Sequence, residues 1–258
     1  MLTDEIRSFR AKLAAGPVYG VFSKSTDPAF VEILGHAGFD FVISDLEHGP
    51  NSILSAQNLI RAAELGGVFP VVRTREGDPS MIGAALDIGA GGVEVPQVSS
   101  REDAELVLRH ARFAPLGMRG VCRFVRAADY SAMERQSYFA ESNEAVTVCH
   151  LEGKAAVDAL DGILDVKGLD VLFIGPYDLS QSLGVPGQVE HPDVIACMSD
   201  VVERCRRRGV AVGTFVDRLE AARRWRAAGV RYIAYSVDVG IFYGAASDIA
   251  RSLRGGAA

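Results

Sequence analysis

The chain has 258 residues, of which 48% are hydrophobic, and it carries a net charge of −6 at pH 7 with an isoelectric point near 5.4. This length fits one α/β barrel or two ordinary domains, and a mean hydropathy of +0.14 supports a large core. Phosphate binding requires a basic stripe, so the acidic balance argues against a nucleic-acid partner. No apolar stretch approaches the ~20 residues that would cross a bilayer.

Cysteine usage and the N-terminal stretch indicate a compartment. The four cysteines show neither CxxC spacing nor the density of a secreted disulfide framework. Residues 1–7 include acidic side chains and lack an apolar segment, unlike a secretory signal. We therefore expect reduced thiols in a cytoplasmic protein.

Apolar runs rich in Val, Ile and Phe alternate with segments of helical periodicity, which is typical of parallel strands and their crossover helices. Eight runs are predicted to be strands: 18–23, 39–45, 69–74, 92–95, 146–152, 171–175, 210–215 and 232–236. Helices are expected to begin at caps and to end at glycines: Asp27-Pro28, Asn51-Ser52, Asp78-Pro79, Ser99-Ser100, His191-Pro192-Asp193 and Asp217 as starts, and Gly35 or Gly38, Gly66, Gly89 and Gly229 as ends. Eight βα units predict one α/β domain over residues 1–258, a (β/α)₈ TIM barrel with its site at the C-terminal ends of the strands.

One stretch interrupts this alternation. Residues 113–143 form a long segment that shows no clear βα unit. Loops of this length inside a compact domain are usually functional. We expect this segment at the active-site rim or at a subunit interface.

Two carboxylates directly follow predicted strands. Glu152 follows the fifth strand and Asp178 follows the sixth, within Phe173-Ile174-Gly175-Pro176-Tyr177-Asp178-Leu179-Ser180. Hard cations such as Mg²⁺ or Mn²⁺ are commonly held by one or two carboxylates, with water and substrate as the other ligands. The pair predicts a catalytic metal site. A helix starting near Pro176 would also aim the backbone N–H groups of Tyr177 and Asp178 at an anionic ligand.

The second and third predicted strands end in further polar residues. Asp45, Glu47 and His48 follow the second strand, and Arg73 ends the third. An imidazole titrates near neutrality, so His48 is a candidate proton carrier beside the carboxylates, although ordinary turn contacts are an alternative. Arg73 could hold an enolate or carboxylate oxygen, form an ion pair with Asp45 or Glu47, or do both.

Several ordered motifs between residues 16 and 249 carry a family resemblance. The most informative are Asp45-Leu46-Glu47-His48-Gly49-Pro50-Asn51, Pro70-Val71-Val72-Arg73, Leu86-Asp87-Ile88-Gly89-Ala90, Arg119-Gly120-Val121, Leu151-Glu152 and residues 173–180. Together they resemble the metal-dependent (class II) pyruvate aldolases of the HpcH/HpaI family, a group that includes 4-hydroxy-2-oxoheptanedioate and 2-keto-3-deoxyrhamnonate aldolases. The resemblance implies a barrel of the phosphoenolpyruvate/pyruvate-domain type.

The resemblance also implies roles for individual residues. Glu152 and Asp178 would bind the divalent metal (Mg²⁺, Mn²⁺ or Co²⁺), which chelates a 2-oxo acid, and no organic cofactor is expected. His48 would be the acid/base, Arg73 would stabilise the enolate, and Asp87 would raise the basicity of the histidine. Because Asp87 precedes the fourth strand, at the far end of the barrel, a neighbouring subunit would have to present it. Members of the family often form oligomers, so a hexamer or trimer of dimers is expected.

The chain departs from the family pattern at positions that could affect substrate choice. Relatives carry Gln where this chain has His150, on the same inward face as Glu152. His150 either contacts the substrate or fills the barrel interior. Lys24 and Arg123 add cations where relatives often have small residues, and either could favour an acidic aldehyde or simply face solvent.

The expected reaction is reversible cleavage of a 4-hydroxy-2-oxo acid into pyruvate, or hydroxypyruvate, and an aldehyde. Residues expected to bind the substrate are Arg73, His150, Gly175, Pro176, Tyr177 and Asp178. Three alternatives stay open. The first is a class I aldolase with a Schiff-base lysine, and the candidate lysines near strand ends are Lys24 and Lys154. The second is an acyl-CoA ester lyase of the citrate lyase beta or malyl-CoA type. The third is a non-catalytic barrel that binds 2-oxo acids.

Overall fold

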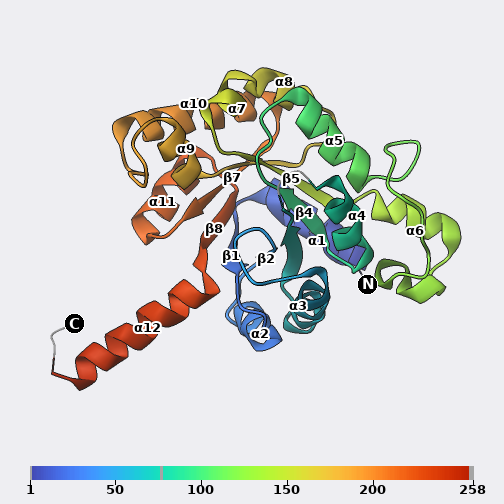
Figure 1. Cartoon of the computed structure of the whole chain (residues 1–258), viewed down its shortest axis with the longest axis horizontal. Helices are drawn as coiled ribbons and strands as arrows, with labels where there is room; N and C mark the ends of the chain where they lie inside the picture. Colours follow the sequence, from blue (N-terminus) through green and yellow to red (C-terminus); the bar gives the residue numbers. More distant parts are fainter. Residues whose placement is uncertain (1, 76–77, 256–258) are drawn as a thin grey trace.

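The structure, a computed structural model, describes residues 2–75 and 78–255. Eight parallel strands pair in chain order, and β8 closes on β1 to complete a barrel. The predicted (β/α)₈ barrel is therefore confirmed (Figure 1). The strands are β1 (Val18–Ser23), β2 (Phe41–Asp45), β3 (Phe69–Arg73), β4 (Gly92–Val95), β5 (Val146–Leu151), β6 (Val171–Ile174), β7 (Ala211–Val216) and β8 (Tyr232–Val237).

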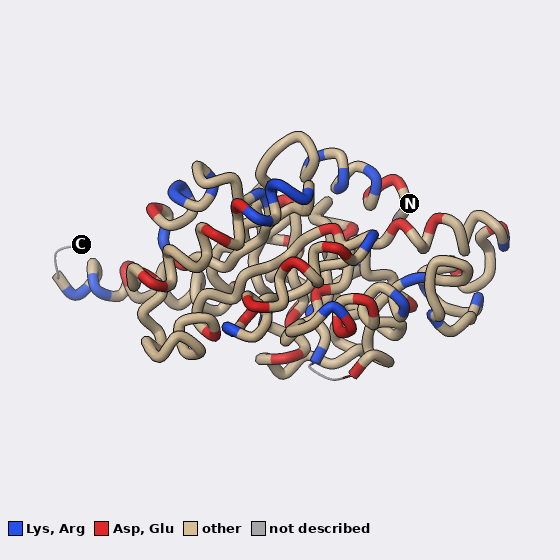
Figure 2. Tube along the Cα trace, turned by 90° about the horizontal axis from the view of Figure 1, so that it is seen from above, with Lys and Arg blue, Asp and Glu red and all other residues tan. Residues whose placement is uncertain are grey.

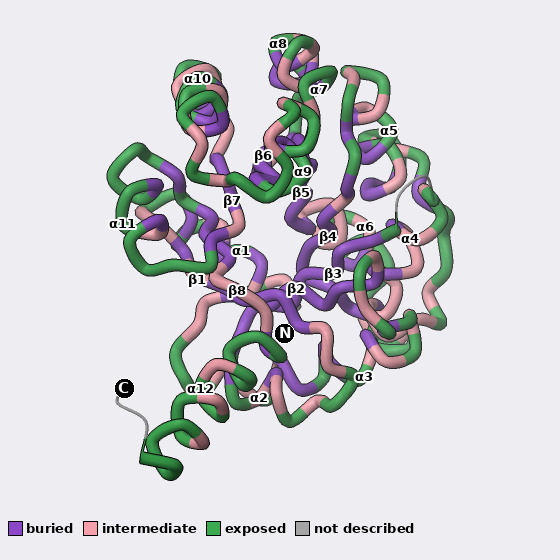
Figure 3. The backbone as a smooth tube through the Cα atoms, turned by 60° about the vertical axis from the view of Figure 1, so that its left-hand side comes forward, coloured by how far each residue is buried: buried purple, intermediate pink, exposed green. Residues whose placement is uncertain are grey.

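Helices surround the barrel on its outer face, whereas the last helix extends away from it (Figure 1). The surrounding helices are α2 (Pro28–His36), α3 (Ile53–Gly66), α4 (Pro79–Asp87), α5 (Arg101–Ala111), α7 (Lys154–Asp158), α8 (Leu160–Leu164), α9 (Pro176–Ser182), α10 (Pro192–Arg208) and α11 (Leu219–Ala228). The extending helix is α12 (Asp238–Leu253), which is exposed along most of its length (Figure 3). None of the helices in the described residues is both long and apolar enough to cross a membrane.

Helix boundaries follow the predicted caps with one exception. The side chains of Asp27, Ser52 and Asp78 accept hydrogen bonds from the first turns of α2, α3 and α4, and Ser100 and His191 do the same for α5 and α10. The prediction that Asp217 caps α11 was wrong. Arg218 occupies that position without a side-chain cap, because the Asp217 carboxylate accepts a hydrogen bond from the Tyr177 hydroxyl at 2.7 Å.

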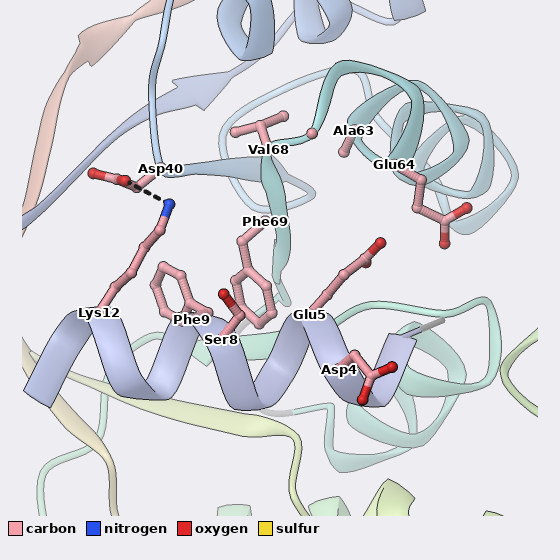
Figure 4. Close-up of a pocket in the computed structure, with 11 residues that line it drawn as sticks. Asp4, Glu5, Ser8, Phe9, Lys12, Asp40, Ala63, Glu64, Val68 and Phe69 are labelled. Carbon is pink, nitrogen blue, oxygen red and sulfur yellow. Dashed lines mark hydrogen bonds and ion pairs between the residues drawn. The ribbon is translucent and has the colours of Figure 1, made fainter.

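Large aromatic side chains fill the barrel interior, and helix α1 (Leu2–Ala15) closes its N-terminal end. Phe9 of α1 stacks on Phe69 with ring centroids 4.1 Å apart, and Phe41 stacks on Tyr232 at 3.9 Å. A β-carbon at Gly20 would lie 2.3 Å from the Phe41 ring, so only glycine fits opposite this aromatic layer. Figure 4 shows Phe9 of α1 beside Phe69.

The segment 113–143 lies near the N-terminal ends of the strands. It contains the 3₁₀ helix η1 (Arg126–Ser131) and helix α6 (Arg135–Ser142). Arg126 forms an ion pair with Glu64 at the end of α3 and donates to the carbonyl of Ile88 after α4. The segment 113–143 therefore lies at the end of the barrel opposite the predicted active-site rim of its own chain. Its place at a subunit interface stays a prediction.

Charged residues of both signs are interspersed along the chain rather than segregated (Figure 2). The absence of a nucleic-acid partner stays a prediction. The carboxylate and arginine pairs of the site are described below.

Candidate active site

A cavity of about 510 Å³ opens at the C-terminal ends of the strands, where the predicted site residues converge. Its volume falls within the ~300–1,000 Å³ that is common for small-molecule sites. The lining residues come from most of the strand ends: Phe22, Lys24, His48, Arg73, His150, Glu152, Phe173, Gly175, Pro176, Tyr177, Asp178, Phe215, Asp217, Ser236 and Val237. A second cavity, of about 280 Å³, lies between α1 and α3 at the opposite end (Figure 4) and is lined by none of the predicted site residues.

Arg73 is held at the cavity edge by a buried carboxylate. Its Nε and Nη2 donate to the two oxygens of Asp45 at 2.9 and 2.6 Å, and Asp45 is fully buried. Burial opposes ionisation of Asp45, but the hydrogen bonds and charge of Arg73 outweigh it and lower the pKa of that carboxyl. The predicted ion pair is confirmed. Asp45 positions Arg73 and does not itself line the cavity.

Glu47 and His48 lie in the loop after β2. The backbone N–H groups of both residues donate to Asp45, which fixes the start of the loop. The Glu47 Oε2 atom lies 3.0 Å from Arg73 Nη1 and 3.8 Å from His48 Nε2. The His48 side chain is mostly exposed and borders the cavity, so its ring nitrogens are accessible to a ligand there.

Glu152 is oriented by two hydrogen bonds to its carboxylate. Nδ1 of His150 lies 2.6 Å from Oε1, and the backbone N–H of Gln97 donates to Oε2 at 3.2 Å. Burial opposes ionisation here too, yet the hydrogen bond and charge of His150 lower the pKa of Glu152. A β-carbon at residue 175 would lie 3.0 Å from Cγ of Glu152, so Gly175 leaves room for this side chain beside the cavity.

The segment after β6 turns directly into helix α9, as predicted. Gly175 is the N-cap and Pro176 the first helical residue, which places Tyr177 and Asp178 in the first turn. Asp178 is exposed and lines the cavity together with Glu152. The hydrogen bond from Tyr177 to Asp217, together with partial burial, raises the pKa of the Tyr177 phenol to about 12, so this hydroxyl stays protonated at neutral pH.

Asp87 lies away from the cavity of its own chain. It is the last residue of α4, and its carboxylate accepts a hydrogen bond from Arg119 at 2.6 Å. Arg119 is itself buried and stacks over the Phe113 ring at 4.5 Å. A role for Asp87 beside His48 would therefore require a second subunit, as the sequence resemblance implied.

The residues of the cavity fit a hard divalent cation. Within the described residues, no group of three or more His, Cys, Asp or Glu side chains is arranged to hold a metal, so the carboxylate pair would need water and substrate to complete the coordination. Oε2 of Glu47 is buried and pairs with Arg73 Nη1 at 3.0 Å, but it forms no well-aligned hydrogen bond within the described residues. Burial raises the pKa of Glu47, and the charge of Glu152 adds to the effect. A cation at the cavity would offset this repulsion between carboxylates.

Sequence reasoning missed one buried residue of the site. Glu94 of β4 is fully buried, and one of its oxygens forms a hydrogen bond with Nε2 of His150. The available signal was an isolated acid inside the apolar strand Gly92–Val95, on a face that must point into the barrel. Of the two lysines considered for Schiff-base chemistry, Lys24 lines the cavity, whereas Lys154 is exposed and pairs with Asp158 at 2.7 Å.

Comparison with known proteins identifies the family of this chain. The family model for HpcH/HpaI aldolase/citrate lyase matches residues 18–245. The chain belongs to the HpcH/HpaI aldolase/citrate lyase family. A curated member, 5-keto-4-deoxy-D-glucarate aldolase from Escherichia coli O9:H4 (strain HS), is 34% identical over 248 residues, covering 95% of this chain and 96% of the relative.

Solved structures of HpcH/HpaI proteins share the fold over nearly the whole chain. A family protein from Burkholderia cenocepacia J2315 superposes with a TM-score of 0.91 at 34% identity, covering 96% of this chain and 99% of the other. An HpcH/HpaI aldolase from Desulfitobacterium hafniense DCB-2 gives 0.86 at 30% identity, covering 95% of each chain. The chain is an enzyme of the aldolase-type carbon–carbon lyase class, as the motifs predicted.

Proposed function

We propose that this HpcH/HpaI enzyme is a divalent-metal-dependent aldolase that reversibly cleaves a 4-hydroxy-2-oxo acid into pyruvate, or hydroxypyruvate, and an aldehyde. The observation that carries the proposal is the convergence of Glu152, Asp178, Arg73 and His48 on one cavity at the strand ends. The named relative that cleaves 5-keto-4-deoxy-D-glucarate supports an acid of this kind as substrate.

Each side chain has a defined task in this reaction. Glu152 and Asp178 would hold the metal, which supplies the Lewis acidity that favours loss of a proton next to a ketone. Arg73 presents a fixed positive charge at the cavity edge for the oxygen that becomes negative in the enolate, and Asp45 keeps the guanidinium in place. His48, exposed at the cavity, moves the proton, directly or through water.

Proton exchange at C3 of pyruvate isolates the first half of this reaction. We expect NMR in deuterated water to show exchange that requires Mg²⁺, Mn²⁺ or Co²⁺ and falls by about 10²-fold or more in Glu152→Gln and Asp178→Asn. Asp158→Asn is the matched control, because Asp158 is an exposed carboxylate paired with Lys154. This variant should exchange the pyruvate protons normally. Exchange that survives both metal removal and the two substitutions would contradict the proposal. Inhibition by acyl-CoA esters would instead favour the thioester lyase.

We also infer that the enzyme works as a homo-oligomer, with the family's hexamer as the expected form and the cytoplasm as the expected location. The inference is supported by α12, which projects from the barrel (Figure 1) and exposes large apolar side chains: Val239, Ile241, Phe242, Tyr243, Ile249 and Leu253. A second copy that covers this helix would remove the apolar surface from water. An oligomer is also the arrangement that a role for Asp87 would need, because this residue lies away from the cavity of its own chain.

A further inference from the structure

Three buried polar side chains form a continuous chain behind the cavity. Glu94 of β4 contacts Nε2 of His150, and Nδ1 of His150 contacts Glu152 at 2.6 Å. All three residues are less than one-tenth exposed. The second oxygen of Glu94 accepts a hydrogen bond from the Tyr232 hydroxyl at 3.2 Å. The chain of contacts therefore runs from the barrel interior to a residue that faces the cavity.

The ring of His150 is immobilised on its face and at both nitrogens. It stacks on Phe173 with centroids 4.4 Å apart and planes inclined by 13°. Nδ1 is occupied by Glu152 and Nε2 by Glu94, so the ring has no free nitrogen to offer a substrate. The sequence allows His150 either to contact the substrate or to fill the barrel interior. A hydrogen bond to the substrate is disfavoured because both ring nitrogens are engaged, and the ring does more than fill space, since it also orients Glu152.

Glu94 and His150 depend on each other for their buried hydrogen bonds. A buried polar atom that loses its hydrogen-bond partner is destabilising, so removing either Glu94 or His150 leaves the other poorly satisfied. The two residues should therefore act as a unit.

We propose that Glu94 and His150 are a positioning pair that holds the Glu152 carboxylate for a divalent cation. The proposal rests on the metal site of the proposed function. His150 fixes Oε1 and Gln97 fixes Oε2, so both oxygens are restrained on the protein side and keep their remaining lone pairs for a cation. Hydrogen-bonding partners of this kind behind a ligand typically change metal affinity by about 10–100-fold.

Direct measurement of Mn²⁺ binding, by electron paramagnetic resonance and calorimetry on the full chain, tests the pair without an activity assay. We expect His150→Ala to weaken Mn²⁺ binding by about 10–100-fold. His150→Asn should recover most of the loss, because the amide nitrogen of Asn takes the place of Nδ1 beside Glu152. Thr147→Val, which removes a buried hydroxyl bonded to Asp170 and Gly168 at the other end of β5, controls for general destabilisation and should bind normally.

A double-substitution cycle tests whether Glu94 acts through His150. Glu94→Gln should weaken binding in the native background but add nothing to His150→Ala. Additive losses of affinity in the double variant would overturn the pairing. If His150→Ala binds Mn²⁺ normally while Glu152→Gln loses the ion, the positioning role is overturned but the proposed function stays intact. If Glu152→Gln binds Mn²⁺ as tightly as the unsubstituted enzyme does, both the metal site and the inference fall. Equal losses in His150→Asn and His150→Ala would also count against a role for Nδ1.

Discussion

At the scale of single residues, a buried ion pair fixes the guanidinium of Arg73 at the edge of the cavity. Asp45 is fully buried against Arg73, so removal of one partner leaves an uncompensated charge. We expect Asp45→Asn to lower the free energy of unfolding by about 3–5 kcal/mol at pH 7, as urea denaturation would measure it. The surface substitution Asp158→Asn should change the same quantity by less than about 1 kcal/mol.

The pH dependence of this loss has a definite sign. The pKa of Asp45 lies below its usual value of 3.8 in the folded protein, so its contribution is complete above that value and disappears as the pH falls through the folded pKa. The difference between Asp45→Asn and the parent should therefore be constant from pH 8 to pH 5 and shrink only below about pH 4. A gap that closes between pH 8 and pH 6 would show that another group carries the effect.

The residues found and missed in the sequence differ in how local their signal is. Glu152, Asp178, Arg73 and His48 each follow an apolar strand run directly, and the barrel rule then brings them to one end. Glu94 and Gln97 act through contacts between β4 and β5, and no spacing along the chain reveals such a pairing. The register between strands is a tertiary property, so the partners of Glu152 became visible only in the fold.

At the scale of elements, α1 acts as the plug of the barrel, and its interior face contributes to stability rather than chemistry. Phe9 is buried between Phe69 and Phe41, at the end of the barrel away from the cavity. Phe9→Ala should lower the free energy of unfolding by about 3–5 kcal/mol, because it leaves a cavity among aromatic rings. Thermal or urea unfolding measures this, and Mn²⁺ affinity should stay unchanged. Ser8→Ala on the exposed face should alter neither quantity, and a loss of metal binding in Phe9→Ala would argue against the separation of the two ends.

Element boundaries show what sequence patterns can and cannot place. The predicted spans of β1 and β4 coincide with the observed ones, since Pro17 and Lys24 flank β1, and Gly91 and Pro96 flank β4. The predicted fifth and sixth strands extended one residue too far, to Glu152 and Gly175, where the chain leaves the ladder to form the site. The failed cap at Asp217 has a similar cause, because its carboxylate serves a contact with Tyr177 across the cavity. Both errors fall at residues that line the site.

At the scale of the whole molecule, the projecting helix α12 is the element through which the proposed assembly would reach the cavity. Phe242 and Tyr243 are 63% and 74% exposed, although Phe242 packs edge-to-face on Phe30 of α2 with ring centroids 6.1 Å apart. The carboxylate of Asp238, at the start of α12, accepts hydrogen bonds from the Ser23 hydroxyl and from the backbone N–H of Lys24. The helix therefore begins at the cavity rim. Covering its apolar face in an oligomer would also fix the geometry of this rim.

We therefore expect the double substitution Phe242→Glu and Tyr243→Glu to dissociate the enzyme, because two buried charges at an apolar interface are costly. Sedimentation equilibrium should show a smaller species, whereas Asp248→Asn on the same helix should retain the parent mass. If a partner supplies Asp87 to each cavity, the dissociated enzyme should lose pyruvate proton exchange while retaining Mn²⁺ binding, since Glu152 and Asp178 belong to one chain. A parent protein that sediments as a monomer, or a dissociated variant with full exchange, would contradict the shared site and leave His48 to act with the carboxylates of its own barrel.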